Sequence, residues 1–160
     1  MKKFLTTLAV CLATVVVMAA DSEKQPVFQM RLVVETPSAG SEQLICQRTN
    51  KETGRISTEK LNVERKVLLD QTALKSADVS KSWGGCSQID FSLTPDGKER
   101  FAEITGQNVG RRLAIVIDGQ FMTAPTIQAV ITSGKGQIAG NFSEQEAKDL
   151  AAKINQAITK

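Results

Sequence analysis

The sequence has no histidine and no tyrosine, and Trp83 is its one tryptophan. The absence of histidine removes the commonest general base, the usual zinc ligand and the Ser-His-Asp arrangement of many hydrolases. Acidic pairs such as Asp90 with Asp96 are present, but most charged residues lie on solvated faces. The sequence therefore predicts a protein that is not an enzyme, and it indicates neither a cofactor nor a metal site.

A basic start and an apolar run open the chain. Residues 1–3 are Met-Lys-Lys, residues 4–17 are almost continuously apolar, and Val17 and Ala19 place small residues at the −3 and −1 positions of a cleavage site. This arrangement is typical of a secretory signal peptide, which we assign to residues 1–20. The apolar run is shorter than the ~20 residues that a spanning helix needs. We therefore expect export to the periplasm or cell envelope, with no stable membrane span after cleavage.

A strong charge of either sign is missing once this leader is set aside. Of the 20 lysines and arginines, Lys2 and Lys3 lie in the leader, which leaves 18 basic against 17 acidic residues. No basic stripe with interleaved aromatic residues remains, so nucleic acid is not an expected partner. The remaining ~140 residues suit one domain. Its core must consist mainly of Ile, Leu, Val and Ala, because aromatic residues make up only 4% of the chain.

Two cysteines, Cys46 and Cys86, lie outside the leader. In an oxidising compartment an isolated pair of this kind is more often a disulfide than a site. Closing a loop of this length would stabilise the protein by ~4 kcal/mol in the chain-entropy model. The alternative is a pair of buried free thiols. The expected export favours the bridge, because disulfides persist outside the cytoplasm.

Alternating apolar and polar residues predict several strands. Phe28, Met30 and Leu32 share one face of residues 27–35, and Ile89 and Phe91 share one face of residues 89–93, as in half-buried strands. Residues 44–48 form a weaker strand candidate. The less regular stretches are a polar turn at 49–55, short apolar pieces at 61–69, a loop with a short helical or extended piece at 70–79, and a turn at 83–86.

Two helices are predicted after residue 93. Thr94 can cap the first helix, with Pro95 in its first turn, and Gly106 weakens its end before Gly110 terminates it. Ser143 begins a Ser-x-x-Glu capping box for the second helix, which continues along the C-terminal residues with one apolar stripe. We expect this second helix to lie across a sheet that contains residues 113–117.

Residues 113–117 form the most apolar strand candidate, and Asp118 and Gly119 follow it. This dipeptide is a hairpin signal, because Asp and Gly tolerate positive φ, and residues 120–124 are then the returning strand. No base, nucleophile or metal partner lies near Asp118 in the sequence, so we interpret Asp118 and Gly119 as structural turn residues. The glycine-rich stretch 133–140 lacks the spacing of a P-loop or of a dinucleotide fingerprint, and we interpret it as a loop and strand.

A combination of short motifs occupies residues 89–151: FSLTPDG at 91–97, FAEIT at 101–105, NVG at 108–110, LAIVIDG at 113–119, AP at 124–125 and GQIAGNF at 136–142. In this combination the chain resembles the head subdomain of the first periplasmic domain (P1) of SecD and SecDF, components of the Sec protein-export machinery. Residues 28–35 and 61–80 resemble earlier parts of the same domain. We therefore divide the mature chain into N-terminal strands and a polar loop at 21–60 and a head-like subdomain at 61–160.

The resemblance implies an α+β fold, an antiparallel β-sheet packed by two α-helices, that lies outside the inner membrane. It also implies contact with a translocating polypeptide, which is the role proposed for the family's module. SecD couples proton flow to movement through transmembrane helices that are not seen in this sequence, so we do not expect a proton-driven motor. Cys46 and Cys86 are not part of the family pattern, and Phe121 and Met122 stand where the family usually has smaller aliphatic residues.

We therefore expect a non-enzymatic exported binding module that contacts unfolded or translocating polypeptide, with Sec translocon components as further partners. The candidate contact residues are Phe121, Met122, Ile127 and Trp83, because exposed apolar side chains can hold an extended chain without reading its sequence. The alternative for these side chains is ordinary core or loop packing. The alternative function is a periplasmic adaptor or interaction domain unrelated to the Sec pathway.

Overall fold

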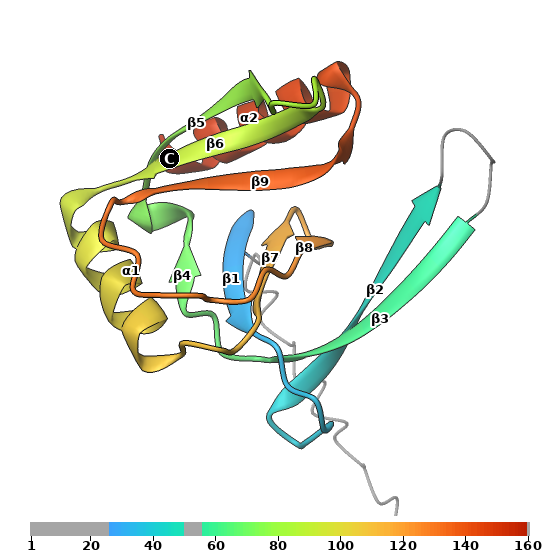
Figure 1. The fold of residues 1–160 in the computed structure, drawn as a ribbon, viewed down its shortest axis with the longest axis vertical. Helices are drawn as coiled ribbons and strands as arrows, with labels where there is room; N and C mark the ends of the chain where they lie inside the picture. The colour runs from blue at the N-terminus through green and yellow to red at the C-terminus, as the bar shows by residue number, and fades with distance from the viewer. Residues whose placement is uncertain (1–25, 50–55, 160) are drawn as a thin grey trace, which may run out of the picture.

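Within residues 26–49 and 56–159, which the computed structural model describes, the chain forms three antiparallel sheets and two α-helices (Figure 1). The expected leader and most of the polar turn expected at 49–55 lie outside the described residues. The elements in chain order are β1 (Phe28–Leu32), β2 (Ser41–Thr49), β3 (Ile56–Glu64), β4 (Leu69–Asp70), the 3₁₀ helix η1 (Gln71–Ala73), β5 (Leu74–Lys81), β6 (Ser87–Leu93), α1 (Pro95–Gln107), β7 (Leu113–Ile117), β8 (Gln120–Thr123), β9 (Lys135–Phe142) and α2 (Glu144–Ile158).

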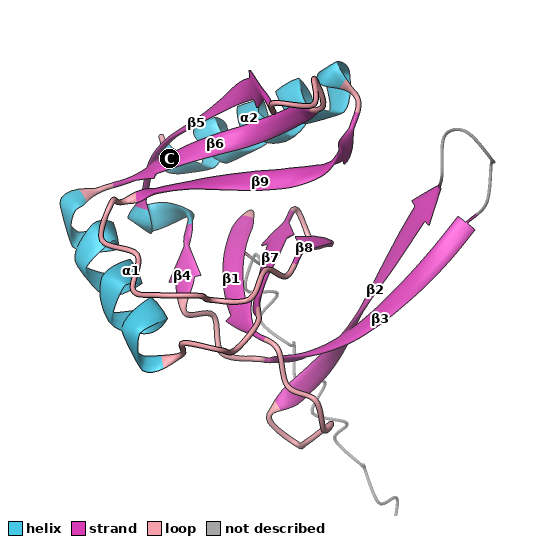
Figure 2. Ribbon diagram, viewed as in Figure 1, coloured by secondary structure: helices cyan, strands magenta, loops and turns pink. Residues whose placement is uncertain are grey.

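The two larger sheets share one hydrophobic core. One sheet has four strands in the order β4-β1-β7-β8, and the other has three strands in the order β5-β6-β9 (Figure 2). In the four-stranded sheet, Phe28 of β1 pairs with Ile117 of β7, and Leu32 pairs with Leu113. The rings of Phe28 and Phe91, one from each sheet, have centroids 5.9 Å apart in the shared core. The structure thus confirms the expected α+β class with antiparallel strands and two helices, although the strands are divided among separate sheets.

Helix α1 begins as the sequence predicts, with Thr94 as its cap. The Thr94 hydroxyl accepts a hydrogen bond from the amide of Gly97 at 3.1 Å, and Pro95 occupies the first helical position, where no amide donor is needed. This end of the helix rests closely on η1, because a Cβ atom on Gly97 would lie 2.3 Å from the carbonyl oxygen of Ala73. Residue 97 therefore has to be glycine for α1 to approach η1 so closely.

Helix α2 has the predicted capping box. The Ser143 hydroxyl accepts a hydrogen bond from the amide of Glu146 at 3.2 Å, and the Glu146 carboxylate accepts one from the amide of Ser143 at 2.7 Å. Ala147, Ala151 and Ile154 are buried on the inner face of the helix. Each helix residue on this face therefore removes apolar surface from water, which stabilises the fold.

The expectation that α2 lies across the sheet containing residues 113–117 was wrong. Helix α2 packs on β5, β6 and β9, whereas residues 113–117 are β7 of the four-stranded sheet. Helix α2 packs mainly on β5, and this strand was not predicted: residues 70–79 were interpreted as a loop with a short helical or extended piece. Polar Ser76 and Asp78 alternate with buried Ala77 in this strand, so its apolar signal is weak, and it forms a strand by pairing with β6.

The turn between β7 and β8 consists of Asp118 and Gly119, whose φ angles are 51° and 75°. Positive φ at both central residues is the geometry of a type I′ hairpin turn, which matches the twist of the flanking strands. The Asp118 carboxylate also accepts a hydrogen bond from Nζ of Lys153 in α2 at 2.5 Å. The turn thus connects the four-stranded sheet to the helix that covers the other sheet.

Strands β2 and β3 form a separate two-stranded hairpin, which we call the arm. The arm extends away from the other strands (Figure 1). Its base packs through Leu44, Leu61 and Val63 on Ala114 and Phe121, in a second hydrophobic cluster apart from the main core. The half of the arm beyond Leu44 and Leu61 has no such apolar support among the described side chains.

Three arginines connect the arm to the four-stranded sheet: Arg31 lies in β1, and Arg111 and Arg112 lie just before β7. Arg31 of β1 is 6% exposed, and it donates to the backbone carbonyls of Glu64 and Arg65. The three ion pairs are Arg31–Glu42, Arg111–Glu64 at 2.9 Å and Arg112–Glu59 at 3.5 Å. The base of the arm is therefore fixed by burial, charge and main-chain hydrogen bonds together.

Candidate functional site

The side chains predicted to contact a partner do not form one surface. Phe121, Met122 and Ile127 are 5%, 9% and 4% exposed. Phe121 lies in the cluster beneath the arm, and Met122 and Ile127 belong to the main core. The expectation that these three residues form an exposed apolar patch was therefore wrong. A hydrophobic cluster lies on each face of β8, so both of its large side chains are buried.

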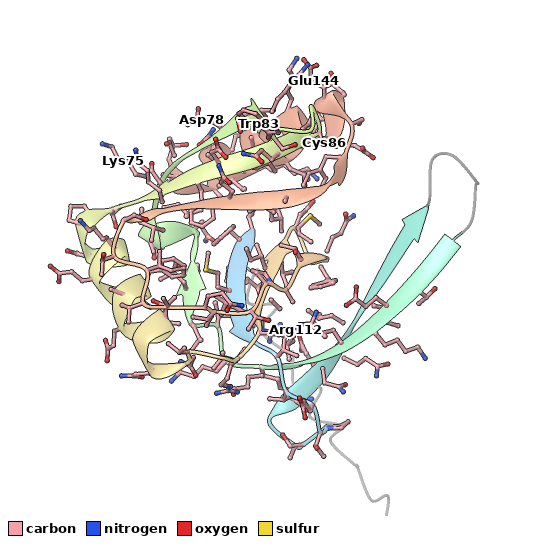
Figure 3. All side chains as sticks on the ribbon, viewed as in Figure 1. Lys75, Asp78, Trp83, Cys86, Arg112 and Glu144 are labelled. Carbon is pink, nitrogen blue, oxygen red and sulfur yellow. The ribbon has the colours of Figure 1, made fainter. Side chains whose placement is uncertain are left out.

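Trp83, the fourth candidate, is completely exposed, with a relative accessibility of 106%. It lies in the turn between β5 and β6 (Figure 3). The turn is closed by backbone hydrogen bonds from Ser82 to the carbonyl of Cys86 and from Gly85 to the carbonyl of Ser82, both 2.8 Å. Gly85 has φ 78°, which glycine adopts without strain. A fixed backbone thus presents an indole ring to solvent, where a lone aromatic side chain has no packing role.

The expected Cys46–Cys86 disulfide is wrong for this structure. Cys86 is a free cysteine and is exposed beside Trp83 (Figure 3). Cys46 belongs to the arm, where its backbone pairs with Glu59 of β3, whereas Cys86 precedes β6 of the three-stranded sheet. The sequence does not show where the two cysteines lie in space, and the fold places Cys46 in the arm and Cys86 in the turn before β6.

The outer face of the three-stranded sheet carries polar side chains and forms an open depression beside the start of α1. Ser76, Asp78, Asp90 and Ser92 line it together with three lysines, Lys75 of β5, Lys135 of β9 and Lys98 of α1. The Ser76 hydroxyl lies 2.9 Å from the Ser92 hydroxyl and 3.3 Å from an Asp78 carboxylate oxygen. These side chains therefore satisfy one another, and charges of both signs surround them, so the depression favours no particular ligand.

Asp118, Asp96 and Glu103 lie in separate local settings and do not form a catalytic cluster. Asp118, in the β7–β8 turn, pairs with Lys153 of α2. Asp96 lies in the first turn of α1, and Glu103 of the same helix accepts a hydrogen bond from Gln107. In the described part of the chain, no three His, Cys, Asp or Glu residues lie close enough to hold a metal ion. The acidic residues thus act as caps, turns and surface charges.

Glu144 links the start of α2 to the end of β5, next to the Trp83 turn. Its carboxylate lies 2.7 Å from Nζ of Lys148 and 3.8 Å from Nζ of Lys81. The hydrogen bond and the charge of Lys148, followed by the charge of Lys81, lower the pKa of Glu144 below its ordinary value. This end of the three-stranded sheet therefore carries a small charged cluster beside an exposed aromatic ring (Figure 3).

The arm is a feature that the sequence analysis missed. Residues 44–48 were only a weak strand candidate, yet β2 and β3 pair along their full nine-residue lengths. Ile45 is 58% exposed on the arm, and Glu59 of the arm forms an ion pair with Arg112, which lies just before β7 (Figure 3). A signal was present in the alternation of Leu61 and Val63 with polar residues, which is typical of a half-buried strand.

Residues 26–49 and 56–159 include no helix that combines the length and apolar character needed to cross a membrane. The described fold is an antiparallel α+β module whose exposed features are a projecting arm and an aromatic turn. Residues 43–158 match the family model of the SecDF P1 head subdomain. The chain therefore belongs to the SecDF P1 head family, which confirms the resemblance found in the sequence.

Relatives of the chain are subunits of the protein translocase. The SecD subunit of Leptotrichia buccalis is 46% identical over 85 residues, which are 53% of this chain and 21% of that protein. The SecD subunit of Aquifex aeolicus is 43% identical over 89 residues, 56% of this chain and 18% of that protein. The chain thus matches about a fifth of the length of these curated relatives.

A solved SecDF structure, described as that of a membrane component that enhances protein export, has a similar fold. It superposes with a TM-score of 0.62 and 31% sequence identity, covering 81% of this chain and 61% of the solved chain. A SecDF structure in a super-membrane-facing form gives the same TM-score and identity, but only 18% of that longer chain is covered. The similarity therefore concerns one module of SecDF.

Proposed function

We propose that this protein is a non-enzymatic accessory of protein export that contacts unfolded or translocating polypeptide on the outer side of the inner membrane. The observation that carries the proposal is the match of residues 43–158 to the SecDF P1 head subdomain. A solved relative is described as enhancing protein export. In this proposal Sec translocon components are further partners, and the chain supplies a polypeptide-facing module.

The exposed apolar side chains support this role. Trp83 and Ile45 are 106% and 58% exposed, and each stands on a hairpin whose backbone is fixed by hydrogen bonds. An aromatic ring on a fixed turn gives a large contact area at a small cost in conformational entropy. Such contacts do not depend on the sequence of the bound chain, which suits a partner that is a different polypeptide each time.

Phe121, Met122 and Ile127 have an indirect role in this proposal. Because they are buried, they hold β8 and the base of the arm in place. Trp83 is therefore the contact residue that we retain from the sequence analysis, and Ile45 is added to it.

Site-specific photo-crosslinking in cells that secrete a labelled polypeptide tests the proposal. A photoreactive amino acid replaces Trp83, and the control places the same amino acid at Glu103, an exposed position on α1. We expect crosslinks to the secreted polypeptide while it is still crossing the membrane, and we expect position 83 to give many more of them than position 103.

The outcomes separate the two functions considered. Adducts with the secreted polypeptide or with Sec components support the export role. Adducts of position 83 with one other envelope protein, at equal yield whether or not export is active, support the adaptor function instead. An absence of adducts with any secreted chain, in cells where the protein is present and export is active, would contradict the proposal.

A further inference from the structure

The outer edge of β3 already accepts one extended segment of the chain. At the base of the arm, the amide of Val34 donates to the carbonyl of Asn62 at 2.9 Å, and Val33 pairs with Val63 in an antiparallel bridge. The extension of β1 therefore acts as a third strand beside the arm. This pairing ends where the chain passes Pro37 and turns, with the amide of Ser41 donating to the carbonyl of Ser38 at 3.0 Å.

The remainder of this edge is oriented for the same kind of pairing. In an antiparallel pair, successive residues direct their backbone groups alternately toward the partner strand and away from it. The carbonyls of Asn62 and Glu64 point away from β2, because they accept from Val34 and Arg31. The alternation therefore directs the amide and carbonyl groups of Lys60 and Thr58 to the same outer edge.

Lys60 and Thr58 are exposed. Among the described residues, none forms a backbone hydrogen bond with either of them on the outer edge. A row of unpaired amides and carbonyls of this kind is a template for another strand. An isolated two-stranded hairpin is also only marginally stable in water, and a third strand stabilises it.

We infer that an extended segment of client polypeptide adds to the outer edge of β3 at Thr58 and Lys60 and continues the line begun by Val33 and Val34. This inference rests on the proposed function and specifies how the polypeptide is held. Backbone hydrogen bonds supply the contact, so nearly any sequence can bind, and the side chains of the bound strand add only modest preferences.

Amide hydrogen exchange, followed by NMR, gives a residue-by-residue test. The probe is a reduced and alkylated polypeptide that cannot refold. In the free protein, the amides of Thr58 and Lys60 exchange quickly, whereas those of Glu59 and Leu61, which point to β2, exchange slowly. At saturating polypeptide we expect the exchange rates of the Thr58 and Lys60 amides to fall at least tenfold. The exchange rates of the Glu59 and Leu61 amides should change little.

Two variants separate backbone pairing from side-chain contact. Thr58→Pro removes the outward amide while leaving the bonds of Glu59 to β2 available, since proline is tolerated on edge strands. Thr58→Ala keeps the amide and is the matched control. Losing one or two backbone hydrogen bonds of about 1 kcal/mol each should weaken binding about five- to thirtyfold in Thr58→Pro and leave Thr58→Ala close to the parent protein.

The results distinguish this inference from the function on which it rests. Binding of the polypeptide with no slowing of exchange at Thr58 and Lys60 would overturn the edge pairing and leave the proposed function intact. Absence of binding would overturn both. Protection of Thr58 and Lys60 that appears without polypeptide and grows with protein concentration would show that a second copy of the chain occupies the edge, which also overturns the inference. If Thr58→Pro fails to fold, the exchange measurement on the parent protein still decides.

Discussion

Asn155 of α2 forms two hydrogen bonds with the backbone of a single residue, Ala77 of β5. Its side-chain oxygen accepts from the Ala77 amide at 3.0 Å, and its side-chain nitrogen donates to the Ala77 carbonyl at 2.7 Å. Strand β5 is at the edge of the three-stranded sheet, so one side-chain amide takes the place of a neighbouring strand. The same contact fixes the position of α2 along the sheet.

Replacing Asn155 should therefore destabilise the protein. In Asn155→Ala both backbone groups of Ala77, a residue that is 1% exposed, lose their partners. A buried polar pair left without partners costs ~1–3 kcal/mol, which urea unfolding measures directly. Gln156→Ala, at the next and exposed position of α2, should change the free energy of unfolding by less than ~0.5 kcal/mol. Equal effects of the two substitutions would contradict the edge-capping role.

Two glycines of α1 should respond in opposite ways to alanine. A Cβ at Gly97 would lie 2.3 Å from the Ala73 carbonyl oxygen, whereas a Cβ at Gly106 would meet only a methyl group of Val130 at 3.5 Å. We expect Gly97→Ala to destabilise the protein by ~1–3 kcal/mol through overpacking, and Gly106→Ala to stabilise it by ~0.5–1 kcal/mol through helix propensity. Thermal unfolding of both variants checks the sign, and stabilisation by Gly97→Ala would contradict the close contact with η1.

The pKa of Glu144 gives a prediction about pH. Because Lys148 and Lys81 lower this pKa in the folded protein, the ionised carboxylate favours folding at pH values above the ordinary glutamate pKa. That stabilisation is lost as the pH falls through the folded-state value. Glu144→Gln should therefore be slightly less stable than the parent protein at neutral pH, and the difference should disappear in acid. Urea unfolding at a series of pH values measures it.

Lys148→Gln supplies the control for this pH effect. Its side chain no longer lowers the pKa of Glu144, so adding Glu144→Gln to Lys148→Gln should change stability much less than it does in the parent protein. A pH-dependent difference of unchanged size in the Lys148→Gln background would show that another group causes it.

Cys86 should react in the folded protein. It is free and exposed, so a thiol reagent should modify it without denaturant, and Cys86→Ser should leave the thermal midpoint in place with or without a reducing agent. Mass spectrometry of the intact alkylated protein checks the first expectation. If the Cys86 thiol reacts only after reduction, the result would contradict the free thiol and support the disulfide expected from the sequence.

Local signals in the sequence predicted much of the fold. Thr94 and Ser143 marked the starts of both helices because their hydroxyls satisfy specific helix amides, an interaction within four residues of the chain. Asp118 and Gly119 marked a hairpin for a similarly local reason, the tolerance of positive φ. Strand β5 was missed because its alternation is supplied by Ser76, Ala77 and Asp78, which become a strand only through pairing with β6.

The candidate site was less accessible to sequence reasoning, because exposure depends on tertiary packing. Phe121 and Trp83 are both large aromatic residues next to turns, and nothing local separates them. The fold covers Phe121 with the base of the arm and leaves Trp83 on a turn that no described residue covers. The predicted Cys46–Cys86 disulfide is absent for a related reason. A disulfide requires two residues of different elements to meet, which local sequence does not determine.

The central claim, that this SecDF P1 head module holds unfolded polypeptide through its exposed surface, is tested most directly by the fluorescence of Trp83, the one tryptophan of the chain. The measurement titrates the protein with a reduced and alkylated, tryptophan-free polypeptide. We predict that Trp83 emits as a water-exposed indole in the free protein and shifts to shorter wavelength with saturation, and that the folded form of the same polypeptide causes no shift. An emission spectrum that stays unchanged at a large excess of unfolded polypeptide would contradict the account.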